Sequence, residues 1–185
     1  MRADARRNYE RLLTAGRQAF SERGEQASMD DIAKRAQVGP GTLYRHFPSR
    51  EALLAAVYRD DVELMADRAA ELAGTLSPFA ALAAWLHEQL AYTKAKLGIN
   101  AVLKNMLKDD TETFEWCRDT MRSALGGLLK SAQDAGAIRP DVDHVTVLRL
   151  VHGVGMAGEN APELADRMLD LVIDGLRARP TPPAP

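Results

Sequence analysis

The chain has 185 residues, a single cysteine and a formal net charge of −2, and hydrophobic residues make up 46% of it. This length suits one or two compact domains with a sizeable core. Cys117 alone cannot close an intrachain disulfide, which excludes a disulfide-stapled scaffold. The start of the chain lacks the apolar run of a signal peptide and no stretch is apolar enough to cross a bilayer, so we expect a soluble, cytoplasmic protein without a membrane partner.

The charge is distributed unevenly along the chain. Residues 1–60 carry eleven Lys and Arg against eight Asp and Glu, a balance of +3, so the remaining residues carry −5. Between Ile32 and Arg50 there is no acidic residue, while four basic residues lie in that stretch. A segment of this kind is compatible with a phosphate backbone.

Apolar residues recur at helical spacing along nearly the whole chain, which predicts an all-α fold of about nine helices. The first helix is expected over about 5–23, closed by a left-handed Gly24. The second begins after Ser28, whose hydroxyl is expected to form a capping box with Asp31. The third is short, about 40–46, because Pro40 favours the first turn of a helix and Pro48 ends one.

Six further helices are predicted by the same reasoning. Their ranges are 49–74, 78–98, 100–107, about 114–136, from a cap at Asp141 or Asp143 to about 158, and 162–176. The adjacent glycines Gly126 and Gly127 disfavour the long helix by about 1 kcal/mol each relative to alanine. The proline-rich end of the chain, 179–185, is expected to be disordered.

Residues 28–47 have the form of a helix-turn-helix, in which two short helices are joined by a turn of three or four residues. In its second helix, Leu43 and Phe47 are one turn apart and face the core. The outward set is Thr42, Tyr44, Arg45 and His46. Arg45 either reads a guanine or holds a phosphate, and the sequence leaves both roles open. Gly41 leaves room for a phosphate at the amino end of this helix.

The stretches Asp31–Ala33, Val38–Phe47 and Ser49–Leu54 resemble the signature of the tetracycline-repressor (TetR) family, and the resemblance covers about residues 8–60. It implies a homodimer on a pseudo-palindromic operator in double-stranded DNA. It also implies a C-terminal domain in which a small molecule shifts the two DNA-reading heads. By the same resemblance Arg50, at a position where the family usually carries lysine, would clamp a phosphate.

These inferences define a predicted organisation and a predicted DNA-contact set. We expect a DNA-binding helix-turn-helix domain over 1–60, an effector-binding and dimerisation domain over 61–178, and the tail over 179–185. The predicted DNA-contacting residues are Ser28, Gly39, Pro40, Gly41, Thr42, Tyr44, Arg45, His46 and Arg50.

The C-terminal half offers candidates for an effector pocket and a dimer interface. Large, adaptable side chains favour an apolar or amphipathic effector, although each is also compatible with plain core. The pocket candidates are Trp85, Met106, Phe114, Cys117, Met121, His152 and Met156. For His152 the pattern favours a core histidine over a ligand-binding one. The dimer is expected through about 141–158 and 162–178, where Gly153, Gly155 and Gly158 permit close helix approach.

Other classes of function are less compatible with the sequence. Neither a Glu-x-x-His pair nor a His-Glu-x-x-His zinc motif occurs, so we expect no catalytic residue, metal or cofactor. Cys117 lies on an apolar stripe, where desolvation disfavours a reactive thiolate. A repressor or activator that needs no ligand, or a DNA-organising dimer, stays open as an alternative.

Overall fold

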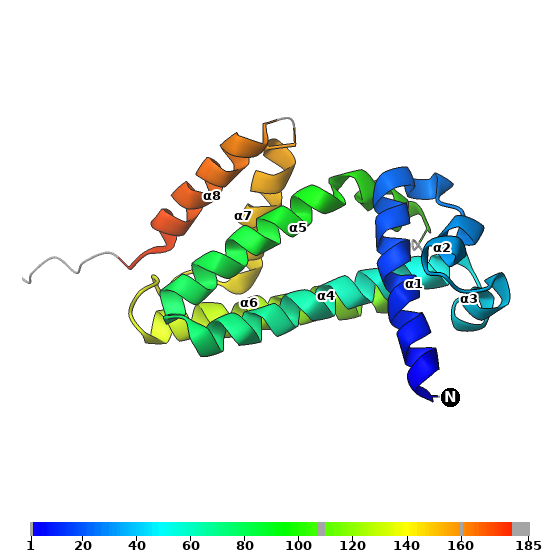
Figure 1. Cartoon of the computed structure of the whole chain (residues 1–185). Coiled ribbons are helices and arrows are strands. Elements are labelled where there is room, and N and C mark those ends of the chain that lie inside the picture. Colours follow the sequence, from blue (N-terminus) through cyan, green and yellow to red (C-terminus); the bar gives the residue numbers. More distant parts are fainter. Residues whose placement is uncertain (1, 107–109, 160, 179–185) are drawn as a thin grey trace, which may run out of the picture. The chain divides into compact units, whose positions relative to one another are not determined.

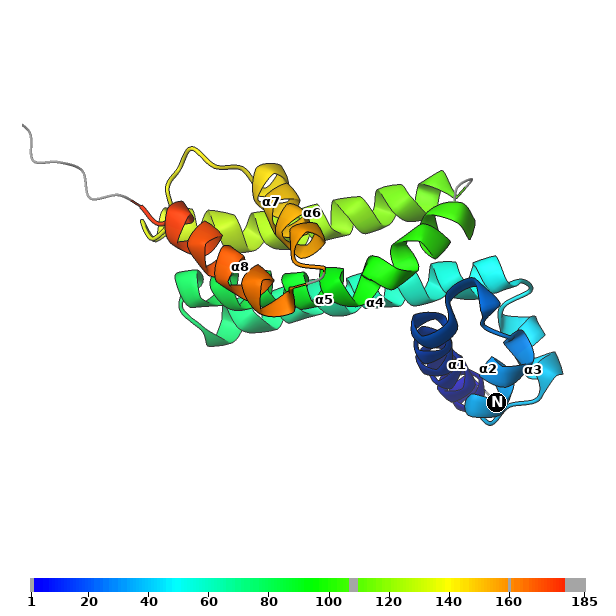
Figure 2. The ribbon, with the colours of Figure 1, turned by 90° about the horizontal axis from the view of Figure 1, so that it is seen from above.

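The computed structural model describes residues 2–106, 110–159 and 161–178 (Figures 1 and 2). Over these ranges the backbone forms helices and no strand, which confirms the all-α prediction. The α-helices are α1 (Arg2–Arg23), α2 (Met29–Arg35), α3 (Pro40–His46), α4 (Arg50–Thr75), α5 (Pro78–Met106), α6 (Thr111–Asp134), α7 (His144–Ala157) and α8 (Pro162–Leu176). A single 3-10 turn, Gly24–Gln26, follows α1.

The chain folds as two compact units. The described residues of Met1–Glu63 and Ala95–Cys117 form the N-terminal unit, and the described residues of Leu64–Lys94 and Arg118–Pro185 form the C-terminal unit. Helices α4, α5 and α6 each contribute residues to both units. Helix α4 continues through residue 60 without interruption, and the predicted tail lies outside the described residues.

The core of the N-terminal unit is built from α1, α2, α3 and the first turns of α4. Its largest fully buried side chains are Leu12, Phe20, Ile32, Leu43, Leu53 and Leu54. A Cβ at Gly16 would lie 3.3 Å from Val57, so the glycine lets α1 pass close to α4. Gly24 has the left-handed φ of +53° that was predicted for the end of α1.

In the C-terminal unit, α7 and α8 form a helical hairpin. The Asp143 carboxylate accepts hydrogen bonds from the backbone N–H groups of Val145 and Thr146, which settles which aspartate caps α7. A Cβ at Gly158 would lie 2.3 Å from the Cβ of Ala165, so the two helices approach too closely for any side chain there.

Helix α8 also lies beside α5 (Figures 1 and 2), and two close contacts between basic and acidic side chains join them. Lys94 Nζ is 3.2 Å from Asp166, and His87 Nε2 is 3.2 Å from Asp170. These pairs are partly exposed and stabilise the unit only weakly.

The structure corrects the predicted helix count from nine to eight over the described residues. A single helix, α5, replaces the two predicted over 78–98 and 100–107. Gly98 lowers helix propensity by about 1 kcal/mol, but no proline follows it to end the helix. Helix α4 also runs one residue past Gly74, and the Thr75 hydroxyl donates to the Glu71 carbonyl at 2.9 Å.

Candidate nucleic-acid interface

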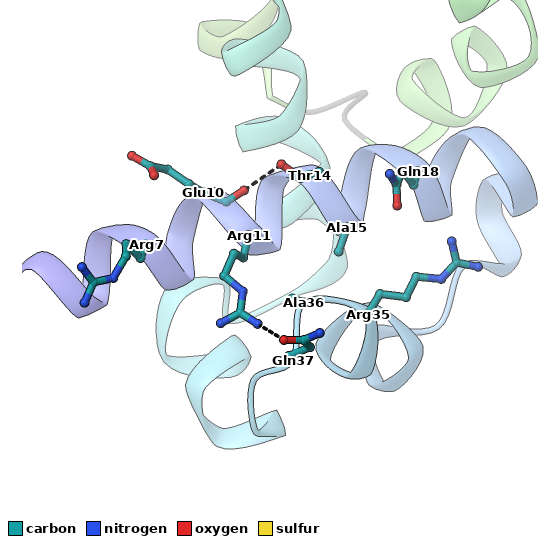
Figure 3. A pocket seen from close by; sticks show the side chains of 9 residues that line it. All are labelled: Arg7, Glu10, Arg11, Thr14, Ala15, Gln18, Arg35, Ala36 and Gln37. Carbon is teal, nitrogen blue, oxygen red and sulfur yellow. Dashed lines mark hydrogen bonds between the residues drawn. The ribbon is translucent and has the colours of Figure 1, made fainter.

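Helices α2 and α3 form the predicted helix-turn-helix, and α3 has the predicted bounds. The left-handed residue of the turn is Gln37, with φ of +53°, whereas Gly39 has an ordinary φ of −70° and is the N-cap of α3. The Val38 N–H donates to the Ala33 carbonyl at 3.0 Å and closes the turn. The Arg11 guanidinium of α1 donates to Gln37 Oε1 at 2.7 Å, so α1 fixes the residue that carries the strained backbone (Figure 3).

Helix α3 places apolar side chains inward and polar side chains outward, as its spacing predicts. Leu43 and Phe47 are buried, while Arg45 is exposed and Tyr44 retains 48% of its accessible surface. Thr42 is half-buried.

The amino end of α3 has an open backbone. Pro40 is its first residue, and nothing lies within 4 Å of where a Cβ would stand at Gly39 or Gly41. A flat partner can therefore reach the backbone there without meeting a side chain.

His46 has a structural role that the sequence did not reveal, and Ser28 caps α2 in a different way from the one predicted. The His46 ring is half-buried, with its centroid 5.9 Å from that of Tyr9 and 6.2 Å from that of Phe47. Ser28 is the N-cap of α2 through its backbone, and its hydroxyl makes no cap bond. The predicted capping box is wrong because the Asp31 carboxylate instead accepts from Arg23 at the end of α1, at 2.9 Å.

The basic residues of the motif differ in how far they are neutralised. Arg35 forms a bidentate pair with Glu22, at 2.9 and 2.6 Å. The Arg50 guanidinium donates to the Ala27 carbonyl, which ties the start of α4 to the residue before the Ser28 cap. Within the described ranges, Lys34 and Arg45 are exposed and form no ion pair.

An open groove of about 430 Å³ runs between α1 and the end of α2 (Figure 3). It is lined by Arg7, Glu10, Arg11, Thr14, Ala15, Gln18, Arg35, Ala36 and Gln37. The sequence reasoning missed it because its contacts join residues more than twenty positions apart, such as Arg11 and Gln37. Its charges are mixed, and its best-defined role is to brace the turn.

A charged network ties α1 to α4 behind the motif. The Arg17 guanidinium donates to Asp61 and to Asp60, each at 2.5 Å. Burial disfavours the charged guanidinium, but the two carboxylates outweigh it and raise the pKa of Arg17. Asp61 is buried, so the network holds a desolvated carboxylate between the two helices.

The predicted pocket residues of the C-terminal unit divide into two groups. Trp85 is fully buried and its indole N–H donates to the Met65 carbonyl at 2.9 Å, and Met121 is also buried. His152 and Met156, in contrast, lie on the exposed face of α7. The expectation of a core histidine is wrong because Val147, Val151 and Val154 form the buried stripe of α7, and His152 points away from it.

Met106, Phe114 and Cys117, the other pocket candidates, belong to the N-terminal unit. The side chain of Met106 lies outside the described residues. The Phe114 ring centroid is 5.9 Å from that of Tyr58, and Cys117 is buried. Arg59 donates to the Thr113 hydroxyl at 3.0 Å. The first turns of α6 therefore pack against α4 within this unit.

Cys117 is expected to react as a buried, inert thiol. Burial raises its pKa from 9.0 to about 12, so at pH 8 the thiolate fraction falls about a thousandfold. Labelling by Ellman's reagent at pH 8 should be slower than in the urea-unfolded chain by at least that factor. Equal rates in the two states would show that the thiol is accessible.

Two further features of the described residues concern membranes and metal ions. No helix among them is long and apolar enough to span a membrane. In the part of the chain that the structure describes, no three His, Cys, Asp or Glu side chains are placed to hold a metal ion together.

Comparison with known proteins places both halves of the chain. The family model for bacterial regulatory proteins of the tetR family matches residues 12–57, and the model for the SbtR-like transcriptional regulator C-terminal domain matches residues 77–178. The chain is 45% identical over 64 residues to the HTH-type transcriptional regulator UidR of Escherichia coli K12. That match covers 34% of this chain and 33% of UidR.

Two solved structures are similar over nearly their whole length. The TetR transcriptional regulator SCO0520 from Streptomyces coelicolor is 36% identical with a TM-score of 0.83, and the match covers 93% of this chain and 99% of that one. A TetR regulatory protein from Mycobacterium vanbaalenii is 32% identical with a TM-score of 0.77, covering 95% and 98%. These matches agree with the helix-turn-helix of α2 and α3, and the chain belongs to the TetR family of bacterial regulatory proteins.

Proposed function

We propose that this protein is a sequence-specific DNA-binding repressor that leaves a pseudo-palindromic operator when a small molecule binds its C-terminal half. The observation that carries the proposal is the outer face of α3. It presents Tyr44 and Arg45 to solvent, within a stretch that has no acidic residue between Ile32 and Arg50. An exposed, acid-free helix with an open amino end suits the major groove of DNA.

The roles within this interface follow from the exposure of each group. Arg45 has the reach and the free guanidinium to read a base edge, while Thr42 and Tyr44 supply neutral hydrogen bonds. The exposed backbone N–H groups around Gly39 and Gly41 suit a phosphate. Arg50 is proposed to act near the backbone of the duplex, chiefly by fixing the start of α4 through its bond to Ala27.

We infer that the protein acts as a homodimer through α7 and α8. On α8, Leu164 and Leu171 are exposed and share a helical stripe with Met168. Leu150 of α7 is also exposed, and a hollow of about 530 Å³ between these two helices is lined by Thr146, Arg149, Leu150, Gly153, Val154 and Met168. An apolar face of this kind, repeated by a two-fold axis, buries itself as a four-helix interface.

The effector is proposed to be a small apolar or amphipathic molecule held in the C-terminal half. The effector must bind one of two dimer conformations, which differ in the spacing of their DNA-reading helices, more tightly than the other. Equal affinity for both conformations would shift no population. The buried Trp85 and Met121 provide apolar surface of the kind such a ligand requires.

The direct test uses DNA fragments that the unmodified protein binds and retains from the genome that encodes it. These should contain inverted half-sites separated by about one helical turn or more. Arg45→Ala should weaken binding to a selected fragment by about tenfold to a hundredfold, and binding to unrelated DNA much less. Lys130→Ala on α6 removes an exposed, surface-paired cation and should bind like the parent. Selected fragments without inverted repeats, or an Arg45→Ala variant that binds as the parent does, would contradict the proposal.

A further inference from the structure

Helix α5 carries a buried polar row within the C-terminal unit. Gln89 and Thr93, one helical turn apart, are its members, and they are the buried polar side chains among the described residues of that unit. Gln89 retains 7% of its accessible surface. The neighbours of the row on the same helix are apolar and fully buried: Trp85, Leu86 and Leu90.

The carboxamide of Gln89 is incompletely paired. Its Nε2 lies 3.4 Å from Thr93 Oγ1, which is a long hydrogen bond. No donor in the described part of the chain lies within hydrogen-bond distance of its Oε1, although that atom is buried. Burying a polar atom without a partner is costly, so its retention in an apolar core points to a partner that binds there.

The neighbours of α5 show which way Gln89 faces. Thr93 packs on α7, since a Cβ at Gly155 would lie 2.7 Å from the Thr93 methyl group. Trp85 contacts α4 through its hydrogen bond to Met65. Gln89 is one turn from each of them, so on the surface of α5 it lies between the side that faces α4 and the side that faces α7. It therefore faces the interior of the unit.

The surroundings define the chemistry of a molecule that would pair with Gln89. Both polar members of the row are uncharged, and no charged side chain described in this unit is buried. An ionised ligand would therefore lose its hydration without gaining a counterion. A carboxamide offers an acceptor and a donor side by side, and a hydroxyl group can pair with either.

We propose that Gln89 is the polar anchor of the effector site and that the effector is a neutral, largely apolar molecule carrying a hydroxyl group. This inference rests on the proposed effector-responsive function. Thr93, held against Gly155, orients the Gln89 carboxamide as a positioning residue.

The test measures binding to the full-length protein, without DNA, by isothermal titration and thermal shift. The probes are matched pairs that differ only in the hydroxyl: 4-propylphenol with 1-fluoro-4-propylbenzene, and 2-naphthol with 2-fluoronaphthalene. The charged probe is 2-naphthoate. In the parent chain at least one hydroxylated probe should bind on the order of tenfold tighter than its fluoro partner, and naphthoate should not bind.

Gln89→Met keeps the length of the side chain and removes its polar atoms. It should abolish the preference for the hydroxylated probe, and Thr93→Val, which is isosteric, should reduce it. Without ligand, Gln89→Met should melt at the parent's temperature or above, because it removes an unpaired buried acceptor. Both variants should bind selected operator fragments as the parent does, which separates failure of this inference from failure of the proposed DNA-binding function.

Three results would overturn the inference. The first is a parent chain that binds neither hydroxylated probe, or binds naphthoate more tightly. The second is a hydroxyl preference that persists in Gln89→Met. The third is a lower melting temperature for ligand-free Gln89→Met, because that would show Gln89 to be satisfied within the fold or by a buried water.

Discussion

Replacing Arg17 with methionine is expected to lower the free energy of unfolding by about 2–3 kcal/mol. Methionine fills much of the volume of the arginine stem but leaves the buried Asp61 without the guanidinium that lies 2.5 Å away. Breaking a buried pair from one side costs more than the pair contributes, because the buried charge that remains loses the compensation of that partner. Since Arg17 itself is about one third exposed, water relieves part of that cost and the upper end of the usual range does not apply.

Urea denaturation followed by circular dichroism measures this effect, and two further variants show its origin. Arg6→Met on the same helix breaks a solvent-exposed pair with Glu10 and should change stability by less than about 0.5 kcal/mol. Adding Asp61→Leu to Arg17→Met should restore much of the lost stability, because the buried carboxylate that Arg17 compensates is then gone. If the double variant is less stable than Arg17→Met alone, the loss of stability in Arg17→Met comes from lost packing and not from the buried charge of Asp61.

Local signals in the sequence were sufficient to predict the helix-turn-helix. Pro40 and Pro48 limit α3 from both sides, and the spacing of Leu43 and Phe47 separates its inner and outer faces. Residues 136–143 and Pro162 likewise indicated where α7 and α8 begin. In each case the signal is a residue with fixed backbone geometry or a capping side chain, and it affects only residues a few positions away in the sequence.

The features that sequence reasoning missed depend on contacts between distant residues. Ser28 and Asp31 have capping-box spacing, but Arg23 captures the Asp31 carboxylate across the turn. Arg50 meets the carbonyl of Ala27, 23 positions earlier, which no local pattern indicates.

Errors about single side chains have a related origin. His152 was assigned to the core because its neighbours are apolar, although the buried stripe of α7 runs through Val147, Val151 and Val154. For Gln89 the sequence carries no signal, because a single uncharged polar residue in an apolar helix does not indicate by itself whether it is buried. Only the packed unit reveals that it is buried and incompletely paired.

Leu171→Glu is expected to convert the protein from dimer to monomer and to lower its affinity for a selected operator fragment at least about a hundredfold. Leu171 retains 73% of its accessible surface in the single chain, which is the largest value among the exposed large hydrophobic residues described. In the proposed dimer this side chain is covered, so glutamate would bury one unpaired carboxylate from each protomer. A monomer presents one reading head, and the gain from engaging two half-sites at once is lost.

The matched control is Leu76→Glu, which changes an exposed leucine just after α4 rather than on the α7–α8 face. It should stay dimeric and bind the operator as the parent does. Sedimentation velocity gives the oligomeric state, and fluorescence anisotropy on full and half operators gives the affinity. On the half operator, Leu171→Glu should bind about as tightly as the parent, because α3 is intact. A Leu171→Glu protein that remains dimeric would show that the two copies meet through another surface, and the assignment of α7 and α8 would then fail independently of α3.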